Sequence, residues 1–235
     1  MERMADALRE EVYRIIWFSD VDAADVNASP PGVLTAGTDP AYFNKINGFW
    51  KQTFAIVAAN AARLTAGLTS RNSQASFAAQ EFTTADTTNR VVTNTLQNMR
   101  YGADFRLRGE ANLQYVTTQS VADQLEREYT ADKTVYSSEA LENGITILKS
   151  GGITVIGFQF WDRIIREFYS DGTKYFLPHR AVLIVKENMQ VGTEEVSNLG
   201  EMDSIYDPVT KLNHLDTMYN IDAKIIEDYK IQAAY

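Results

Sequence analysis

The chain has 235 residues, a net charge of −9 and 45% hydrophobic residues, so it is long enough to bury one large core or two modest ones. The acidic charge opposes non-specific binding to nucleic acid, and the 22 Lys and Arg residues form no patch that would override it. The absence of cysteine excludes disulfides, thiol nucleophiles and thiolate metal sites. No apolar run is long enough to span a bilayer and the N-terminal residues are acidic, so we expect neither a membrane partner nor a secretory signal.

The first part of the chain predicts two helices joined by a loop. Apolar residues recur at helical spacing over residues 2–18 and again over residues 40–67. Pro40 suits the first turn of the second helix, because Asp39 before it can serve as the cap. The turn-forming residues of 20–40 predict a long surface loop between the helices.

The middle of the chain changes to an alternation of strands and helices. We expect residues 69–82 to be irregular and residues 84–101 to form a third helix. The later patterns predict a strand at 112–117, a helix at 121–129 capped by Ser120, a hairpin of 144–148 with 153–158, a helix at 161–169 and a buried strand at 180–186.

The segment 219–235 alternates between apolar and polar residues and predicts one long strand. We expect this strand to close a sheet formed earlier in the chain or to pair with a neighbouring subunit. Its apolar, structural face is predicted to carry Ile221, Ile225, Tyr229 and Ile231.

These elements predict a mixed α/β fold of the α+β class with two lobes. Residues 69–192 form a sheet-centred lobe, and residues 1–68 and 193–235 form the second lobe. The segments 20–40 and 192–215 are polar connections that are long for a compact monomer, so we expect them to lie at contacts between subunits.

The sequence predicts no catalytic residue, metal site or cofactor. A zinc site would need both His179 and His214 together with distant carboxylates, and His179 is better explained as a loop residue at the entrance of a strand. Asp20, Asp22 and Asp25 begin like a calcium-binding EF-hand loop, but the later ligand positions do not match, which favours a solvated acidic loop. No Gly-x-Ser-x-Gly motif of a serine hydrolase occurs.

The densest basic cluster consists of Arg100, Arg106 and Arg108. These side chains either pair with Asp104 and Glu110 in the same chain, or contact another subunit or packaged DNA. The candidate subunit contacts are therefore Asp20, Asp22, Asp25, Arg100, Arg106 and Arg108.

Several passages of the chain carry a resemblance to a known family. They are Glu11–Asp20, Tyr42–Lys51, Leu96–Leu107 with the following Tyr115–Thr117 and Val121–Gln124, and Leu177–Ile184 with a turn at Met189–Gly192 and the closing period-2 strand. Together they are similar to the major capsid proteins of tailed bacteriophages and prophages. The resemblance implies the Hong Kong 97 phage fold, with a sheet-centred axial domain and a peripheral domain that contains a long strand. Family chains also have an N-terminal arm and an extended hairpin loop, whereas the residues before Pro40 predict one helix and one loop.

The resemblance further implies a structural function without catalysis. Such a chain self-associates into capsomers and then into an icosahedral shell, with portal or scaffold proteins as possible partners and DNA bound only non-specifically. It would be assembled in the cytoplasm of the bacterial host and would reside in the virion. Two alternatives stay open: another virion or head-completion component, which would form rings of a small fixed number, and an uncharacterised enzyme.

Overall fold

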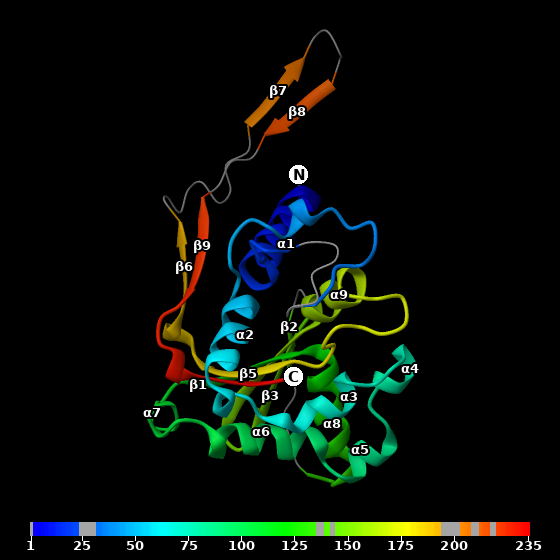
Figure 1. Cartoon of the computed structure of the whole chain (residues 1–235), viewed down its shortest axis with the longest axis vertical. Coiled ribbons are helices and arrows are strands. Elements are labelled where there is room, and N and C mark those ends of the chain that lie inside the picture. Colours follow the sequence, from blue (N-terminus) through cyan, green and yellow to red (C-terminus); the bar gives the residue numbers. More distant parts are fainter. Residues whose placement is uncertain are drawn as a thin grey trace.

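The protein folds around one mixed β-sheet. The computed structural model describes residues 2–23, 32–134, 139–141, 144–193, 203–207, 212–216 and 220–235. The sheet has the strand order β10-β5-β1-β4-β3-β2, in which β1 and β4 run parallel and the other neighbours run antiparallel (Figure 1). Its strands are β1 (Leu113–Thr118), β2 (Glu139–Leu141), β3 (Ile145–Ser150), β4 (Ile153–Phe158), β5 (Ala181–Val185) and β10 (Ile231–Ala234).

Two further antiparallel pairs, β6 with β9 and β7 with β8, lie outside this sheet. They are β6 (Met189–Thr193), β7 (Asp203–Asp207), β8 (Leu212–Asp216) and β9 (Ile221–Ile225). The α-helices are α1 (Glu2–Phe18), α2 (Phe49–Ala59), α3 (Thr69–Asn72), α4 (Phe77–Gln80), α5 (Thr84–Thr88), α6 (Val91–Gly102), α7 (Phe105–Arg108), α8 (Gln119–Ala131) and α9 (Gln159–Phe168). Short 3-10 turns are η1 (Pro40–Tyr42), η2 (Ala61–Arg63), η3 (Ala66–Leu68), η4 (Lys186–Asn188) and η6 (Asp228–Lys230).

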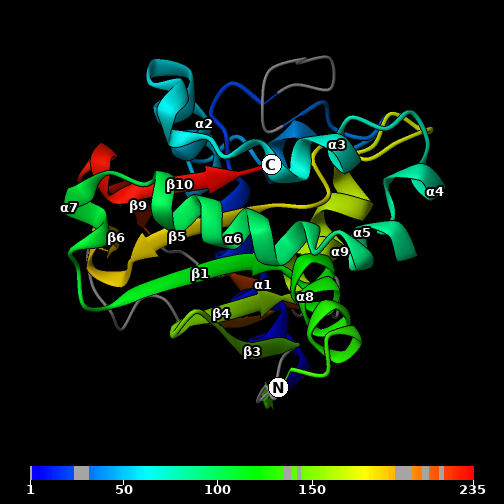
Figure 2. The same ribbon diagram turned by 90° about the horizontal axis from the view of Figure 1, so that it is seen from below.

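Helices cover both faces of the sheet, with α1, α2 and α9 on one side and α6 and α8 on the other (Figure 2). Strand β5 is buried at every position, as its continuous apolar run predicts. Leu183 of β5 packs into the α6–α8 layer, while Val182 and Ile184 pack into the layer of α1, α2 and α9. The predicted strand at 180–186 and the α+β fold class are therefore confirmed.

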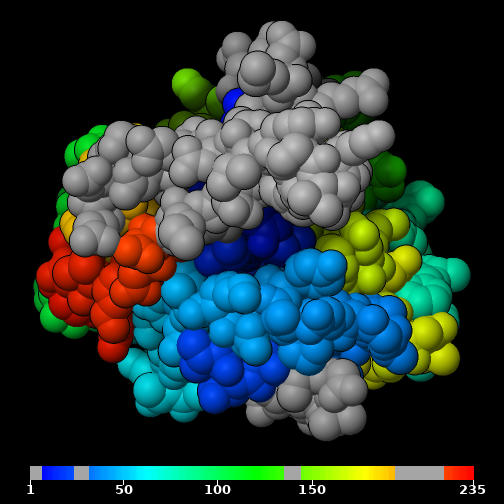
Figure 3. Space-filling model, turned by 90° about the horizontal axis from the view of Figure 1, so that it is seen from above, coloured from blue at the N-terminus to red at the C-terminus, as the bar shows by residue number. Residues whose placement is uncertain are grey.

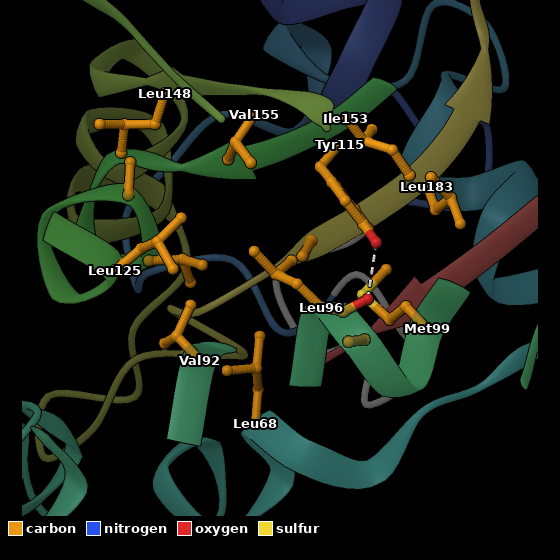
Figure 4. Packing of buried hydrophobic residues seen from close by; sticks show 14 of the residues in the cluster. Leu68, Val92, Leu96, Met99, Tyr115, Leu125, Leu148, Ile153, Val155 and Leu183 are labelled. Carbon is orange, nitrogen blue, oxygen red and sulfur yellow. Dashed lines mark hydrogen bonds between the residues drawn. The ribbon is translucent and has the colours of Figure 1, made fainter. Parts of the chain in front are cut away.

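The α6–α8 layer holds its polar atoms in hydrogen bonds. Tyr115 of β1 extends from the sheet to α6, where its hydroxyl donates to the carbonyl oxygen of Leu96 at 2.7 Å (Figure 4). Burial of this phenol raises the pKa of Tyr115 well above its ordinary value. The hydroxyl therefore stays protonated and acts as a donor that fixes α6 over the sheet.

The predicted helix over residues 40–67 is wrong in its extent. Asp39 does cap a turn, since its Oδ1 accepts the N–H of Ala41 at 2.9 Å, but this turn is only η1. Helix α2 starts after Gly48, which contacts the end of α1 so closely that a Cβ there would lie 2.8 Å from the carbonyl oxygen of Ile16. Gly48 permits this close crossing because it has no Cβ, and its extended backbone, with a ψ of 171°, separates α2 from the preceding residues.

The predicted helix over residues 84–101 is divided into α5 and α6. Arg90 lies between them with a φ of 52°, a left-handed conformation that ends one helix and cannot cap the next with its side chain. Glu128 of α8 supplies the missing cap, because its buried carboxylate accepts the N–H groups of Val92 and Thr93 at 2.9 and 2.8 Å. The segment expected to be irregular, 69–82, contains the short helices α3 and α4.

The terminal segment is two strands instead of the single strand that its alternation predicts. Asn188 holds the interruption: its Nδ2 donates to the carbonyl oxygens of Glu227 and Lys230 at 3.0 and 3.3 Å, and its Oδ1 accepts the N–H of Glu227 at 2.8 Å. The chain turns through η6 and joins a different sheet, with β9 paired to β6 and β10 paired to β5. The expected division of the chain into two lobes stays a prediction.

Candidate assembly surfaces

Four strands form an arm that continues from the central sheet, and we define this arm as β6, β7, β8 and β9. Strand β5 continues through η4 into β6, and β9 continues through η6 into β10, so the β5–β10 pair leads directly into the β6–β9 pair. Figure 1 shows β7 and β8 beyond the far end of β6 and β9, apart from the six-stranded sheet. The polar connection expected over 192–215 thus contains a strand pair that its sequence pattern did not reveal.

The base of the arm is fixed to α2. The side chain of Gln52 donates from Nε2 to the carbonyl oxygen of Ala223 at 2.7 Å and accepts at Oε1 from the N–H of Ile225 at 2.9 Å. Figure 3 shows the red residues of β9 beside the light-blue residues of the α2 region on this face. The edge of β9 is therefore covered by α2, whereas β6 has β9 as its one strand partner among the described residues.

The β7–β8 pair places acidic residues on one face. Asp203 pairs directly with Asp216 in the register, and Asp207 pairs with Leu212. Since alternate strand positions share a face, Asp207 lies on the face of Asp203 and Asp216. Like charges directly opposite each other destabilise a strand pair, and an isolated two-stranded pair is only marginally stable in water. In this register His214, opposite Ile205, lies at a position between the aspartates.

Two of the three acidic loop candidates bind a lysine of the same chain. Lys51 of α2 lies 2.8 Å from a carboxylate oxygen of Asp20 and 3.3 Å from one of Asp22. Although partial burial disfavours the ammonium, hydrogen bonds and charge interactions with both carboxylates raise the pKa of Lys51. Asp20 is 1% exposed, so it fixes the end of α1 to α2 internally. Asp25 lies outside the described residues.

The basic candidates also make bonds within the chain. Arg106 donates from Nε and Nη2 to the carboxylate of Asp104 at 3.0 and 3.1 Å, and these hydrogen bonds, with one from Arg63, hold the pKa of Asp104 well below its usual range. Arg100 donates to the carbonyl oxygen of Gly151 at 2.8 Å, and Arg108 donates to a main-chain carbonyl of α6 at 3.0 Å. Each guanidinium has five N–H groups, so these bonds leave donors that can contact a partner.

Exposed aromatic rings lie among these arginines. Tyr101 at the end of α6 is 66% exposed and Phe105 at the start of α7 is 75% exposed. The guanidinium of Arg100 lies 6.0 Å from the ring of Tyr101, and that of Arg106 lies 5.8 Å from the ring of Phe105. We call this area the α6–α7 surface and define it by Tyr101, Phe105, Arg100, Arg106 and Arg108. Large exposed rings beside cations are typical of interaction surfaces.

The four residues predicted for the structural strand divide into three groups. Ile225 of β9 and Ile231 of β10 are buried at 3% and 1% exposure, and Ile221 packs partly buried against the same core. Tyr229 lies in η6 with its ring 3.7 Å from the guanidinium of Arg106, so it connects the terminal segment to the α6–α7 surface.

An open groove of about 1000 Å³ lies between α1, α8, α9 and β3. At its side, Ser120 Oγ lies 2.9 Å from His179 Nδ1, and His179 Nε2 lies 2.8 Å from the carbonyl oxygen of Gln80. That carbonyl can only accept, so Nε2 carries the proton and Nδ1 accepts from Ser120. Asp162 occupies the first N–H groups of α8, accepting from Gln119 at 2.5 Å and from Ser120 at 3.3 Å.

The electrostatics of this group do not suit nucleophilic catalysis. Burial lowers the pKa of His179 to about 4, which makes it a weak base near neutral pH. Burial raises the pKa of Asp162 to about 6, although hydrogen bonds from Ser120 and Gln119 favour its charged form and act in the opposite direction. The N–H groups that could stabilise an oxyanion are already bound to Asp162. His179 precedes β5 as predicted but is buried, and no sequence motif marks its contact with Ser120.

Neither a metal site nor a membrane-spanning helix occurs among the described residues. There, no three His, Asp or Glu side chains are grouped so that they could hold a metal ion. In the same part of the chain, every helix is too short or too polar to cross a bilayer. His214 lies in β8.

The comparisons with known proteins relate this fold to a phage particle. No family model and no curated protein sequence matches the chain. One chain in a solved structure described as "Satellite phage P4 procapsid including size determination (Sid) protein" matches with a TM-score of 0.51 at 10% sequence identity. The match covers 99% of this chain and 62% of the other, so the chain spans less than two thirds of that protein's length. The protein thus has a mixed α+β fold similar to that of a chain in a phage procapsid.

Proposed function

We propose that this protein is a structural capsid subunit of a bacteriophage or prophage, a major head protein of the Hong Kong 97 type. In this proposal it self-associates into capsomers and an icosahedral shell that encloses DNA, is assembled in the host cytoplasm and resides in the virion. The observation that carries the proposal is the likeness to a procapsid chain, which extends over 99% of this chain. A likeness over the whole length is stronger support than one confined to the central sheet.

The arm supports the same proposal on independent physical grounds. A strand with an unpaired edge is a template for pairing with another chain, and β6 has no strand partner on one side among the described residues. Val191 in the middle of β6 is 45% exposed, although valine is usually buried in a strand pair. An exposed apolar edge strand that extends from a compact body is expected to pair with another subunit.

The proposal is tested by measuring the association of the purified chain. Sedimentation velocity over a range of concentrations should show reversible association into rings or shells, and negative-stain images should show capsomers of five or six subunits. Rings of one other small number would favour a head-completion component. A concentration-independent monomer or a compact dimer would contradict the proposal.

A pair of variants separates edge pairing from a general loss of apolar surface. Val191→Lys places a charge on the β6 edge and should weaken association. Ile226→Lys changes a residue of similar size that is 53% exposed but lies outside the strands, and it should leave association unchanged. An equal effect of both variants would contradict a specific function of the β6 edge.

A further inference from the structure

Two arginines of the α6–α7 surface carry a positive charge that no carboxylate of the described residues neutralises. Arg100 and Arg108 each donate to a main-chain carbonyl oxygen, at 2.8 and 3.0 Å. A carbonyl oxygen carries no net charge, and one hydrogen bond leaves most of the five N–H groups of a guanidinium able to bind an anion. Asp104, the carboxylate between them in the sequence, is bound instead by Arg63 and Arg106. The surface can therefore attract an anionic group to Arg100 and Arg108.

Two flat aromatic rings lie exposed beside these charges. Tyr101 and Phe105 are 66% and 75% exposed, which are the highest values among the large apolar side chains of the described residues. The guanidinium of Arg100 lies 6.0 Å from the ring of Tyr101, and Arg108 binds the carbonyl oxygen of the same residue. Figure 2 shows α6 and α7 on the face of the molecule that is seen from below. Such rings offer a binding partner a flat apolar face next to a cation.

Single-stranded nucleic acid combines the two chemical groups that this surface fits. A guanidinium binds a phosphate through two parallel N–H bonds, and an unpaired base stacks on an aromatic ring. The bases of a duplex are paired and stack on each other, so they have no face to offer to Tyr101 and Phe105. An acidic peptide would bind the arginines but would leave both rings in water. The combination of rings and guanidinium groups therefore favours an unpaired strand over a duplex or an acidic peptide.

The net charge of −9 does not prevent this contact. At an ionic strength of about 0.1 M, exposed charges interact over about 10 Å, so a bound strand responds mainly to the groups nearest to it. In this part of the chain the carboxylates of Asp104 and Glu110 are bound by Arg106 and Lys230. Their repulsion of a phosphate is thereby reduced, and the charges of the two arginines without a carboxylate partner decide the local potential.

We propose that the α6–α7 surface binds single-stranded DNA, with unpaired bases stacked on Tyr101 and Phe105 and phosphates bound by Arg100 and Arg108. The rings select unpaired bases, and the arginines supply the part of the affinity that depends on salt. The choice of DNA over RNA rests on the proposed function, in which the shell encloses DNA. The binding chemistry itself does not depend on that function.

Fluorescence anisotropy with a labelled oligo(dT) of about 12 nucleotides tests the contact. At about 0.1 M salt the wild type should bind this oligonucleotide at least about tenfold more tightly than a duplex of the same length, because only the single strand can stack on the rings. It should bind oligo(dT) at least as tightly as oligo(U), and more tightly than a polyglutamate peptide.

Two double variants separate the two parts of the surface. The ring variant, Tyr101→Ser with Phe105→Ser, should bind oligo(dT) at least about tenfold more weakly with the same salt dependence, and should bind the duplex like the wild type. The arginine variant, Arg100→Gln with Arg108→Gln, should bind both more weakly. Its slope of log affinity against log salt for oligo(dT) should fall by about 1.4, since each phosphate contact of a single strand contributes about 0.7. Tryptophan at both ring positions should retain the affinity, which distinguishes lost stacking from misfolding.

The controls change similar groups elsewhere in the chain. Tyr42→Ser removes a ring that is 50% exposed and lies 5.1 Å from the guanidinium of Arg14, but Arg14 is paired with Glu11. Lys45→Gln with Arg163→Gln removes two positive charges at exposed positions outside α6 and α7. Both controls should bind oligo(dT) like the wild type with the same salt slope, and melting temperatures should be equal for all variants.

Several outcomes would overturn the proposal. They are equal affinities of the wild type for oligo(dT) and the duplex, an unchanged affinity of the ring variant, and tighter binding of polyglutamate than of oligo(dT). Tighter binding of oligo(U) would overturn the choice of DNA. None of these results affects the proposed function, which is measured by association of the protein without DNA. A chain that binds oligo(dT) as expected but never associates would overturn the proposed function and leave the binding chemistry in place.

Discussion

Gln52 of α2 binds the backbone at Ile225 of β9 as a neighbouring strand would. Its amide accepts the N–H of Ile225 at 2.9 Å and donates to the carbonyl oxygen two residues earlier at 2.7 Å. A single side chain thereby satisfies two backbone groups at the edge of β9 and fixes the base of the arm to the body.

Gln52→Leu should therefore lower the free energy of unfolding by about 1 to 3 kcal/mol, since it leaves two backbone groups unpaired at a part-buried site. Hydrogen exchange at the amide of Ile225 should become faster by a larger factor than exchange at the other amides of β9. The control Gln74→Leu removes an exposed hydrogen bond to the carbonyl oxygen of Ser70, and it should change stability little. Unchanged exchange at Ile225 in Gln52→Leu would contradict this assignment.

The two faces of β9 should respond differently to substitution. Ile225 is 3% exposed in the core formed with α1, α2 and α9, and burying such a side chain stabilises a protein by roughly 1.5 to 3 kcal/mol. Ile225→Asp should cost more than this amount because it also buries a charge, and it should yield unfolded or insoluble protein. Lys224→Ser, at the exposed neighbouring position, should melt like the wild type. Equal melting midpoints for the two variants would disprove the packing of β9.

Glu128 should be essential for the start of α6. Its fully buried carboxylate accepts two N–H groups of α6 and the hydroxyl of Thr93 at 2.7 Å. Glu128→Gln replaces an acceptor oxygen by a donor that faces N–H groups, so we expect a loss of about 1 to 3 kcal/mol in a urea denaturation experiment. Asp123→Asn, on the exposed side of α8, should have an effect below about 0.5 kcal/mol. A similar effect of both substitutions would contradict the capping function.

Asp162 and His179 should contribute opposite pH dependences. The pKa of Asp162 is raised from 3.8 to about 6 in the folded protein by burial, so the folded state holds more protons than the unfolded state between these two values. The stabilising contribution of Asp162 therefore falls as pH rises toward 6. The pKa of His179 is lowered to about 4 by burial, so the unfolded state holds more protons between about 4 and its ordinary value. His179 therefore adds stability as pH rises from 4 to 6.5. Arg166, which lies near both groups, favours the charged carboxylate and disfavours the charged imidazole.

Single variants should separate these two contributions. Asp162→Asn should make stability rise more steeply between pH 4 and 6 than in the wild type, and His179→Gln should make it rise less steeply or fall. Each difference should amount to about 3 kcal/mol across its window, because one pKa unit corresponds to about 1.4 kcal/mol. Urea denaturation at several pH values measures both slopes. Parallel curves for the three proteins would refute the opposing contributions.

The sequence predicts most elements whose periodicity is local. The strand and helix from residue 112 to 129, the hairpin around 151 and the buried run of β5 follow from alternation, helical spacing and turn residues, and they correspond to β1, α8, β3, β4 and β5. The predicted cap was wrong, because Ser120 lies inside α8 and Thr118 precedes the helix. These signals are reliable because each element lies in one environment along its whole length.

The breaks between elements depend on tertiary contacts and could not be predicted. The interruption at η6 is fixed by Asn188, which is distant in sequence, and the start of α2 is fixed by the approach of α1 to Gly48. At Ile226 and Glu227 the alternation of apolar and polar residues is interrupted, and this is the one sign of the first break in the local sequence. The β7–β8 pair was not predicted, because polar residues occur at both odd and even positions of these strands. Such a sequence has no alternation of apolar and polar residues and is therefore interpreted as a loop.

The candidate surfaces were only partly accessible to sequence reasoning. The arginine cluster could be seen, but its bonds to Asp104, Gly151 and α6 come from the folded chain. Asp20 looked like an exposed acid and is buried against Lys51, since its position depends on how α1 meets α2. Its function as a subunit contact, like those of the other candidate residues, stays a prediction.

The continuity of β5 with β6 and of β9 with β10 has a mechanical consequence. A load applied to β6 or β9 passes along the peptide backbone through the short turns η4 and η6 into β5 and β10. Strand β5 is bonded to β1 on one side and to β10 on the other, so pulling it along its axis loads the hydrogen bonds of two ladders at the same time. Such a load is thus borne by a strand that is buried at every position, and β6 and β9 cannot be displaced far without straining the central sheet.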